Sequence, residues 1–211
     1  MGRVVQPELL DGLPHDDPET IRSRRDLRMI NGLMGNFHWM RKRVPGRRET
    51  RVVELGAGDG ALLNMLCREG RQLVGVDRAP RPERLAEEIE WVQGDVREVL
   101  GKVLRAGDTV IANLLLHQFE DRELGEMGRA LQRCEEIRAC EPLRSRRALA
   151  QGTILWPLLN RVTRYDMRVS VRAGFRRGEL PDLLGLDGEW QLEERCTLRG
   201  AYRLSARRRR R

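Results

Sequence analysis

Residues 52–61, VVELGAGDGA, decide the fold. The apolar residues Val52, Val53 and Leu55 are typical of a short buried strand, and glycines follow at positions 56, 58 and 60. The segment from Ala61 to Glu69 then has a helical character. Because glycine tolerates positive φ and lets a ligand approach the backbone, this stretch predicts a strand, a tight turn and a helix that begins beside a ligand.

The same alternation of strand and helix continues along the chain. Strands alternating with helices predict an α/β fold with a doubly wound, mostly parallel sheet, whose ligands bind at the carboxyl ends of the strands. Residues 190–198 and 202–206 alternate in polarity on either side of Gly200, which indicates an antiparallel pair added to the sheet. The other expected strands are 73–77, 89–93, 109–116 and 137–140, and the expected helices are 84–88, 99–105 and 124–134.

A helical cap is expected before the first strand, over residues 1–47. Asp17 followed by Pro18 is a favourable helix start, and apolar residues recur at helical spacing from Leu27 to Met40. Gly32 and Gly35 leave open whether this is one bent helix or two, and Pro45-Gly46 closes the segment.

Composition narrows the class of protein. The 211 residues carry a formal net charge of +8, and the five arginines of Arg207–Arg211 account for 5 of it, which leaves 8 − 5 = +3 elsewhere. We expect this basic tail to be a solvated end and nucleic acid to be an unlikely partner. No apolar stretch is long enough for a membrane span and no secretory leader is evident, so a cytoplasmic location is expected. The four cysteines form no CxxC pair and only three histidines occur, so no metal site is expected.

Acidic residues at the strand ends indicate which ligand the glycine turn holds. Glu54 lies inside the first strand and would repel a pyrophosphate, whereas it would attract the ammonium group of S-adenosylmethionine. Asp77 ends the second strand, where it could accept hydrogen bonds from both ribose hydroxyls of S-adenosylmethionine or of NAD, so it does not discriminate between the two. Asp95 ends the third strand, where it could accept from an adenine amino group, and Asn113 ends the fourth.

Four motifs in this order resemble those of the class I S-adenosylmethionine-dependent methyltransferases: ELGAGDG (54–60), VGVD (74–77), QGDV (93–96) and ANLLLHQFED (112–121). The resemblance covers about residues 48–206, and it implies a seven-stranded sheet of order 3-2-1-4-5-7-6 in which only strand 7 is antiparallel. It implies that S-adenosyl-L-methionine is the cofactor. The cofactor-binding residues it implies are Glu54, Gly56, Ala57, Gly58, Gly60, Asp77, Arg78, Asp95, Val96 and Asn113.

The methyl acceptor is less directly encoded. The fourth motif lacks the proline-aromatic turn of enzymes that methylate base amino groups, which disfavours a nucleobase. His117 is the leading candidate for a catalytic base because its ordinary pKa lies near neutral pH, although a purely cofactor-binding role stays open. The Tyr165-Asp166 pair is a second candidate for the catalytic group.

Residues 148–188 are longer than a plain crossover requires and are expected to form a substrate lid. Trp156, Phe175, Trp39 and Phe37 are the aromatic residues that could wall an acceptor chamber. We therefore expect O-methylation of a small phenolic or polyketide-like metabolite, and a homodimer is left open.

Three other functions remain as alternatives. One is an RNA- or protein-directed methyltransferase that docks through the tail at 207–211. Another is an NAD-dependent reductase, which is disfavoured because Val169 stands where a lysine should follow Tyr165. The third is a catalytically silent module that binds the cofactor.

Overall fold

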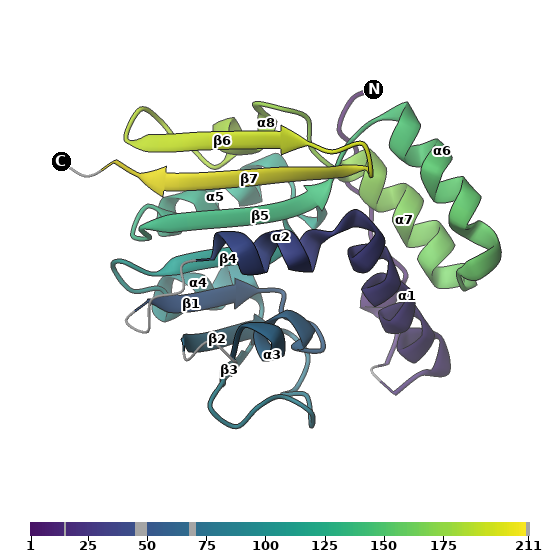
Figure 1. Ribbon diagram of the computed structural model, residues 1–211, viewed down its shortest axis with the longest axis horizontal. Coiled ribbons are helices and arrows are strands. Elements are labelled where there is room, and N and C mark those ends of the chain that lie inside the picture. The colour runs from purple at the N-terminus through teal and green to yellow at the C-terminus, as the bar shows by residue number, and fades with distance from the viewer. Residues whose placement is uncertain (15, 45–49, 68–70, 210–211) are drawn as a thin grey trace.

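A seven-stranded sheet of order β3-β2-β1-β4-β5-β7-β6 runs through the molecule (Figure 1). The computed structural model describes residues 1–14, 16–44, 50–67 and 71–209. Strand β7 is antiparallel to both β5 and β6, and the other neighbours are parallel. This confirms the predicted fold class and strand order. The strands are β1 (Arg51–Leu55), β2 (Gln72–Asp77), β3 (Glu90–Gln93), β4 (Thr109–Asn113), β5 (Glu136–Pro142), β6 (Trp190–Cys196) and β7 (Ala201–Arg208).

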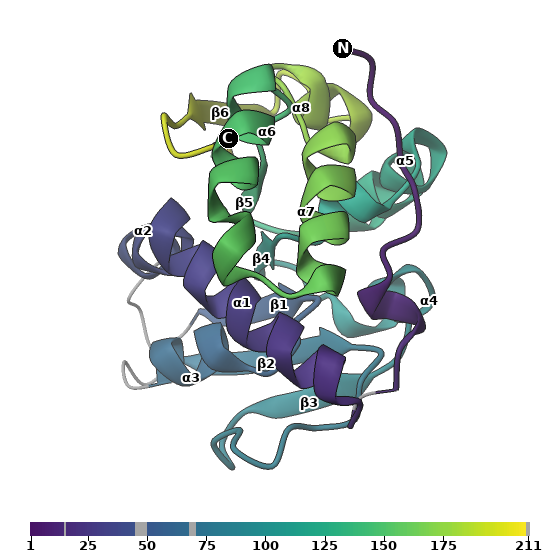
Figure 2. The same ribbon diagram turned by 90° about the vertical axis from the view of Figure 1, so that its right-hand side faces the viewer.

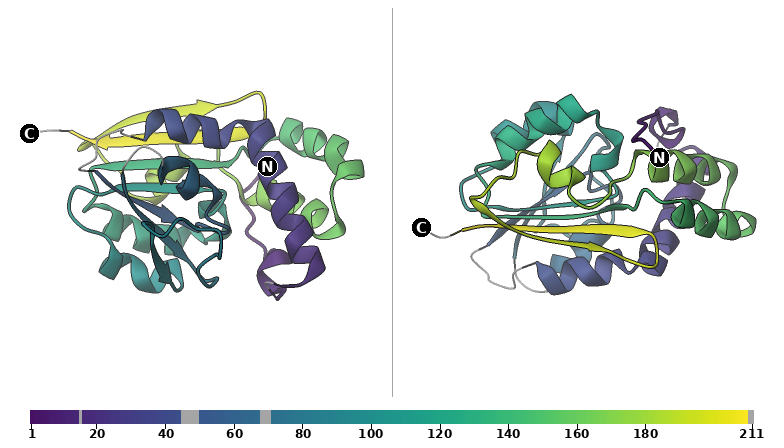
Figure 3. Two further views of the ribbon diagram at one scale, coloured as in Figure 1. Left: turned by 60° about the horizontal axis from the view of Figure 1, so that its bottom comes forward. Right: turned by 90° about the horizontal axis from the view of Figure 1, so that it is seen from above.

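Helices cover both faces of the sheet (Figure 3), and an apolar core lies on each face. Helices α2 (Asn36–Arg43) and α3 (Ala61–Cys67) cover one face, where Val52 and Leu63 are buried. Helices α4 (Val96–Val103), α5 (Asp121–Leu131) and α8 (Glu179–Leu183) cover the other, where Val53 and Leu124 are buried. Successive residues of β1 thus enter opposite cores, which explains why this central strand is apolar on both faces.

Three further helices lie beyond the carboxyl ends of the parallel strands (Figures 1 and 2). They are α1 (Pro18–Met34), α6 (Arg146–Leu155) and α7 (Arg161–Ala173). Asn160 caps α7, since its side chain accepts from the Thr163 backbone N–H at 2.7 Å. The same residue binds α1, because its backbone N–H donates to the Asp26 carboxylate at 2.9 Å. The cap and the first part of the expected lid are therefore joined in one cover.

The expected helical start is confirmed, because the Asp17 side chain caps α1 by accepting from the Glu19 backbone N–H. Gly35, with φ of 70°, ends α1 and precedes α2, so the cap contains two helices rather than one bent helix. Pro45-Gly46 and the expected boundary between residues 47 and 48 lie outside the described residues.

Residues 3–11 form a segment that we call the N-terminal strap, which runs beside α7 in Figure 2 and ends in the short 3-10 helix Leu10–Gly12. Polar contacts hold it along its length. The Val4 backbone N–H donates to the Arg172 carbonyl at 3.3 Å, and the Leu9 backbone N–H donates to the Asp166 carboxylate at 2.7 Å. Arg3 donates from its Nε to the Ala173 carbonyl at 2.9 Å.

Several element predictions need correction. The helix expected at 84–88 is wrong, because those residues form turns. The Asn64 side chain takes the place of helical hydrogen bonds there: it donates to the Arg84 carbonyl and accepts from the Ala86 backbone N–H, both at 3.0 Å. The strand expected at 109–116 ends at Asn113, since Leu114 has φ of 56°.

The expected lid and tail are both divided by the structure. Helices α6 and α7 lie over the strand ends, whereas Leu180, Leu184 and Leu186 belong to the core under α5. Arg207 and Arg208, expected in a solvated tail, are instead residues of β7. Arg210 and Arg211 lie outside the described part of the chain.

Candidate active site

A cavity of about 270 Å³ lies at the carboxyl ends of β1 and β4, under the cover formed by α1, α6 and α7. Its floor includes Glu54, Gly56, Ala57 and Gly58 of the glycine turn. The covering helices contribute apolar side chains, and the N-terminal strap contributes Glu8, Leu10 and Asp11. The apolar lining residues of the cover are Leu27, Ile30, Met34, Leu155, Met167 and Val171.

The glycine turn requires its glycines for two different reasons. Gly56, Gly58 and Gly60 all have positive φ, at 66°, 56° and 70°. A Cβ at Gly56 would lie 2.6 Å from Leu115, and a Cβ at Gly60 would lie 2.5 Å from Leu85, so both positions are also closed by packing. At Gly58, which lines the cavity, nothing lies within 4 Å of an added Cβ. Gly58 therefore leaves space that a ligand can fill.

Two buried acceptors in this cavity have unused hydrogen-bonding capacity. Glu54 is 3% exposed, and its Oε2 has no hydrogen-bond partner among the described residues. Burial raises the pKa of Glu54 well above its usual value, and the charges of Asp77 and Asp59 add to this. The Oδ1 of Asn113 also lacks a partner in the described chain, while its Nδ2 donates to Asn31 at 3.0 Å. A cationic group such as a ligand ammonium would satisfy both acceptors.

The acids at the ends of β2 and β3 have defined positions beside this turn. Asp77 accepts from the backbone N–H groups of Gly58 at 2.7 Å and Ala79 at 2.9 Å, which fixes its carboxylate next to the glycines. Asp95 caps α4, where Val96 is the first residue, and pairs with Arg78 at 2.6 Å. Hydrogen bonds from Arg97 hold the pKa of Asp95 well below its usual range.

Five of the predicted cofactor residues thus line the cavity, and five do not. The first group is Glu54, Gly56, Ala57, Gly58 and Asn113, and the second is Gly60, Asp77, Arg78, Asp95 and Val96. The second group lies at the turn and at the ends of β2 and β3, and its contacts with the cofactor stay a prediction.

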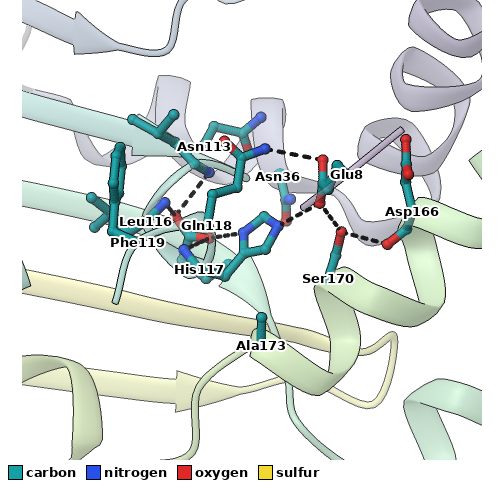
Figure 4. Close-up of polar contacts among 12 residues, drawn as sticks. Glu8, Asn36, Asn113, Leu116, His117, Gln118, Phe119, Asp166, Ser170 and Ala173 are labelled. Atoms are coloured by element: carbon teal, nitrogen blue, oxygen red, sulfur yellow. Dashed lines mark hydrogen bonds and ion pairs between the residues drawn. The ribbon is translucent and has the colours of Figure 1, made fainter. Parts of the chain in front are cut away.

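His117 is buried between two carboxylates (Figure 4). It is 2% exposed, and its Nδ1 lies 2.7 Å from Glu141 Oε2, while its Nε2 lies 3.2 Å from Glu8 Oε1. Burial alone would lower the pKa of His117, but the hydrogen bonds to Glu141 and Glu8 outweigh it and raise the pKa to about 9. At neutral pH the ring is therefore an imidazolium that donates from both nitrogens, and it has no lone pair for a proton while Glu8 is in place.

Glu141 holds the loop that carries His117. It is fully buried at the end of β5, and it accepts from the backbone N–H groups of Leu115 at 3.2 Å and Leu116 at 2.8 Å. Four donors in all, counting the backbone N–H and ring of His117, converge on this one carboxylate. Glu141 is therefore the residue that fixes the orientation of the imidazole.

The structure does not bring Tyr165 and Asp166 to the cavity together. Tyr165 is 44% exposed and lies outside the lining, whereas Asp166 lines the cavity and accepts from the backbone N–H groups of Leu9 and Leu10. Burial raises the pKa of Asp166 to about 6, although the hydrogen bond from the Leu9 backbone N–H acts to lower it. The assignment of a catalytic role to this pair stays a prediction.

Of the four aromatic residues expected to wall an acceptor chamber, Phe37 lines the cavity. Phe175 is fully buried in the core, with its ring centroid 6.0 Å from that of Tyr202. Trp39 lies against Arg203, and Trp156 lies against Arg168. Apart from Phe37, the apolar part of the chamber wall is therefore aliphatic, and polar and charged residues make up much of the rest.

Several site residues carry little sequence signal. Glu8 and Ser170 reach the cavity from segments far apart in the chain. Glu141 directly follows the strand expected at 137–140 and was not among the expected site residues. Glu141 and His117 follow two neighbouring parallel strands, β5 and β4, so the sequence could have suggested that their side chains meet. Across residues 1–14, 16–44, 50–67 and 71–209, no group of three or more potential metal-binding side chains is found, and no helix is long and apolar enough to cross a membrane.

A family model described as a methyltransferase domain matches residues 53–135. The matched segment contains the glycine turn, Asp77, Asp95, Asn113 and His117. No curated protein shows significant sequence similarity to the chain.

Solved structures share the fold at low sequence identity. The plantazolicin methyltransferase BpumL in complex with S-adenosylhomocysteine has a TM-score of 0.66 at 12% identity, over 92% of this chain and 92% of that chain. An O-methyltransferase family protein from Burkholderia thailandensis has a TM-score of 0.62 at 17% identity, over 89% and 59%. Human N-acetylserotonin methyltransferase in complex with S-adenosylmethionine has a TM-score of 0.53 at 20% identity, over 94% and 61%.

Proposed function

We propose that this chain, a class I S-adenosylmethionine-dependent methyltransferase, methylates an oxygen of a small phenolic or polyketide-like acceptor. The observation that carries the proposal is one continuous cavity, which joins the glycine turn and Glu54 to His117 under the cover formed by α1, α6 and α7. The cofactor end and the candidate acceptor end therefore face each other inside the same enclosure.

The residues at the cofactor end fit S-adenosylmethionine. Gly58 provides open space beside the backbone, and the orphan acceptors of Glu54 and Asn113 suit an ammonium group. We expect Asp77 to bind the ribose hydroxyls and Asp95 the adenine edge. When bound, the cofactor supplies an electrophilic methyl group on a sulfonium.

The cover supports a small acceptor over a macromolecular one. Helices α1, α6 and α7 lie over the strand ends, and their aliphatic side chains line the cavity. Two structural neighbours are described by their names as acting on plantazolicin and N-acetylserotonin, which is consistent with small or peptide-sized acceptors for this fold.

The chemistry asked of the chain is mainly alignment. Holding donor and acceptor in line while excluding water can supply roughly 7–11 kcal/mol of the barrier. His117 lines the same cavity. With Glu8 displaced from its Nε2, an imidazolium there would stabilise an ionised acceptor oxygen by donating to it. If Glu8 moves away from Nε2, the pKa of His117 falls toward neutral. The neutral imidazole could then act as the base that removes the proton of the acceptor hydroxyl.

A panel of phenols incubated with the protein and S-adenosylmethionine tests the proposal. We expect methyl ethers as products, identified by mass spectrometry, from at least one phenol. The matched control is the same phenol already blocked as its methyl ether, which should gain nothing. Some compounds of the panel carry a hydroxyl group together with a nucleophilic carbon or nitrogen. Methylation of that carbon or nitrogen rather than of the hydroxyl would contradict the oxygen assignment.

A further inference from the structure

Three hydrogen-bond donors from two different elements converge on the carboxylate of Glu8 (Figure 4). His117 Nε2 lies 3.2 Å from Oε1, and Gln118 Nε2 lies 3.0 Å from Oε2. The hydroxyl of Ser170, on α7, contacts Oε1. The same hydroxyl lies 2.7 Å from the Asp166 carbonyl, and its single proton favours the charged acceptor.

The three donors lie on α7 and on the loop that follows β4, whereas the carboxylate belongs to the N-terminal strap. Glu141 holds His117 from the Nδ1 side, and this contact does not involve the strap. The strap belongs to no strand of the sheet, and backbone hydrogen bonds at Val4, Leu9 and Leu10 hold it to α7. Arg3, at the start of the strap, also donates to the carbonyls of His117 and Phe119 at 3.2 and 2.5 Å. Displacing Glu8 therefore requires the part of the strap around residue 8 to move, while Arg3 and Glu141 keep the loop that carries His117 and Gln118 in place.

The contacts show that this place suits an anionic oxygen. His117 carries a positive charge there, and Gln118 and Ser170 add neutral donors. Burial alone would raise the pKa of Glu8, but the hydrogen bond and charge of His117, together with the hydrogen bonds from Ser170 and Gln118, outweigh it and lower the pKa, so Glu8 remains ionised. A neutral alcohol in the same place would leave the imidazolium with a weaker partner.

We propose that His117, Gln118 and Ser170 form an oxyanion seat for the methyl acceptor, and that Glu8 fills this seat until an acceptor carrying a carboxylate or phenolate displaces it. The inference rests on the proposed function, because it places an acceptor in this cavity. It goes further in two respects: the acceptor binds through an acidic oxygen, and entry requires the strap to move. Glu8 then acts as an internal competitor of the acceptor.

Benzoate binding to the Glu8→Ala protein tests the seat without any turnover. The full chain is saturated with S-adenosylhomocysteine, benzoate is added, and benzyl alcohol serves as the matched neutral probe. The imidazole signals are followed by NMR, which is practical because the chain has three histidines. A His117→Gln protein assigns the signal of interest.

The expected results concern both affinity and the pKa of His117. Removing the Glu8 charge should lower that pKa by about 1–3 pH units, and saturating benzoate should restore it. Benzoate should bind Glu8→Ala about tenfold or more tightly than the unaltered protein, because the internal competitor is gone. Benzyl alcohol should neither restore the pKa of His117 nor bind Glu8→Ala more tightly than the unaltered protein. Ser170→Ala in the Glu8→Ala background should weaken benzoate binding. Asp11→Asn removes a strap acid that interacts with His117 through its charge without a hydrogen bond, and it should lower the pKa of His117 much less than Glu8→Ala does.

The seat would be refuted if benzoate bound Glu8→Ala no better than benzyl alcohol, with the pKa of His117 unmoved. Where Glu8→Ala fails to fold, Glu8→Gln preserves the shape and removes the charge, and the same comparison applies. Failure of the proposed function is a separate result: benzoate would occupy the seat normally while no phenol was methylated.

Discussion

Replacing Glu141 by alanine should be among the most damaging single changes in this protein. The variant leaves the backbone N–H groups of Leu115 and Leu116 without their acceptor, and it leaves the His117 imidazolium without its Nδ1 partner. Breaking a buried charged pair costs about 3–5 kcal/mol, since the remaining charge stays buried and uncompensated.

Urea unfolding at pH 7 measures this loss. The matched control is Glu126→Ala, which removes an exposed acid paired with Arg122 one helical turn away and should change the free energy of unfolding by less than about 1 kcal/mol. A loss below about 1 kcal/mol for Glu141→Ala would refute the buried arrangement around His117.

The pH dependence gives an independent check on the same cluster. The folded-state pKa of His117, about 9, lies above its ordinary value of 6.5. Its contribution to stability is therefore fully present below pH 6.5 and is lost as the pH rises through 9. We expect this decline in the unaltered protein and a much flatter profile in Glu141→Ala; equal slopes would show that His117 is not the titrating group.

Three further outcomes follow from the site. Asp77→Ala should weaken S-adenosylhomocysteine by about 1.5–3 kcal/mol in calorimetry, through lost hydrogen bonds to the ribose, and an unchanged affinity would mean that β2 does not end at the ribose. Gly58→Val should abolish cofactor binding, whereas Gly107→Val, also at positive φ with open space around it, should lose stability but retain the cofactor; similar affinities would contradict the placement of the ligand. His117→Ala should lower turnover by roughly 10²–10⁴ with cofactor affinity nearly intact, and a proportional loss of both would make His117 a cofactor contact.

Local sequence patterns predicted the sheet because each strand is bounded by a local signal. Gly56 to Gly60 end β1, Asp77 ends β2, and Gly200 separates the final two strands. The failures occurred where distant side chains replace local backbone bonds. Asn64 holds residues 84–86 in turns, and Glu141 takes the N–H groups that a longer β4 would have used.

The two ends of the cavity differ in how far the sequence predicts them. The glycine turn is contiguous, so its role at the floor of the cavity could be predicted from spacing. The pairing of Glu8 with His117 spans 109 positions, and it depends on a strap with no periodic pattern. Glu141 and Glu8 together raise the pKa of His117, and no property of the local sequence indicates this.

The most direct test of the account is the destination of a labelled methyl group. The protein is given S-adenosylmethionine with an isotopic label in the methyl group, together with a mixture of phenols and aromatic carboxylic acids, transfer RNA and protein, and the small-molecule and macromolecular fractions are counted separately. The account predicts label in the small-molecule fraction, on oxygen. Label confined to transfer RNA or protein would contradict it.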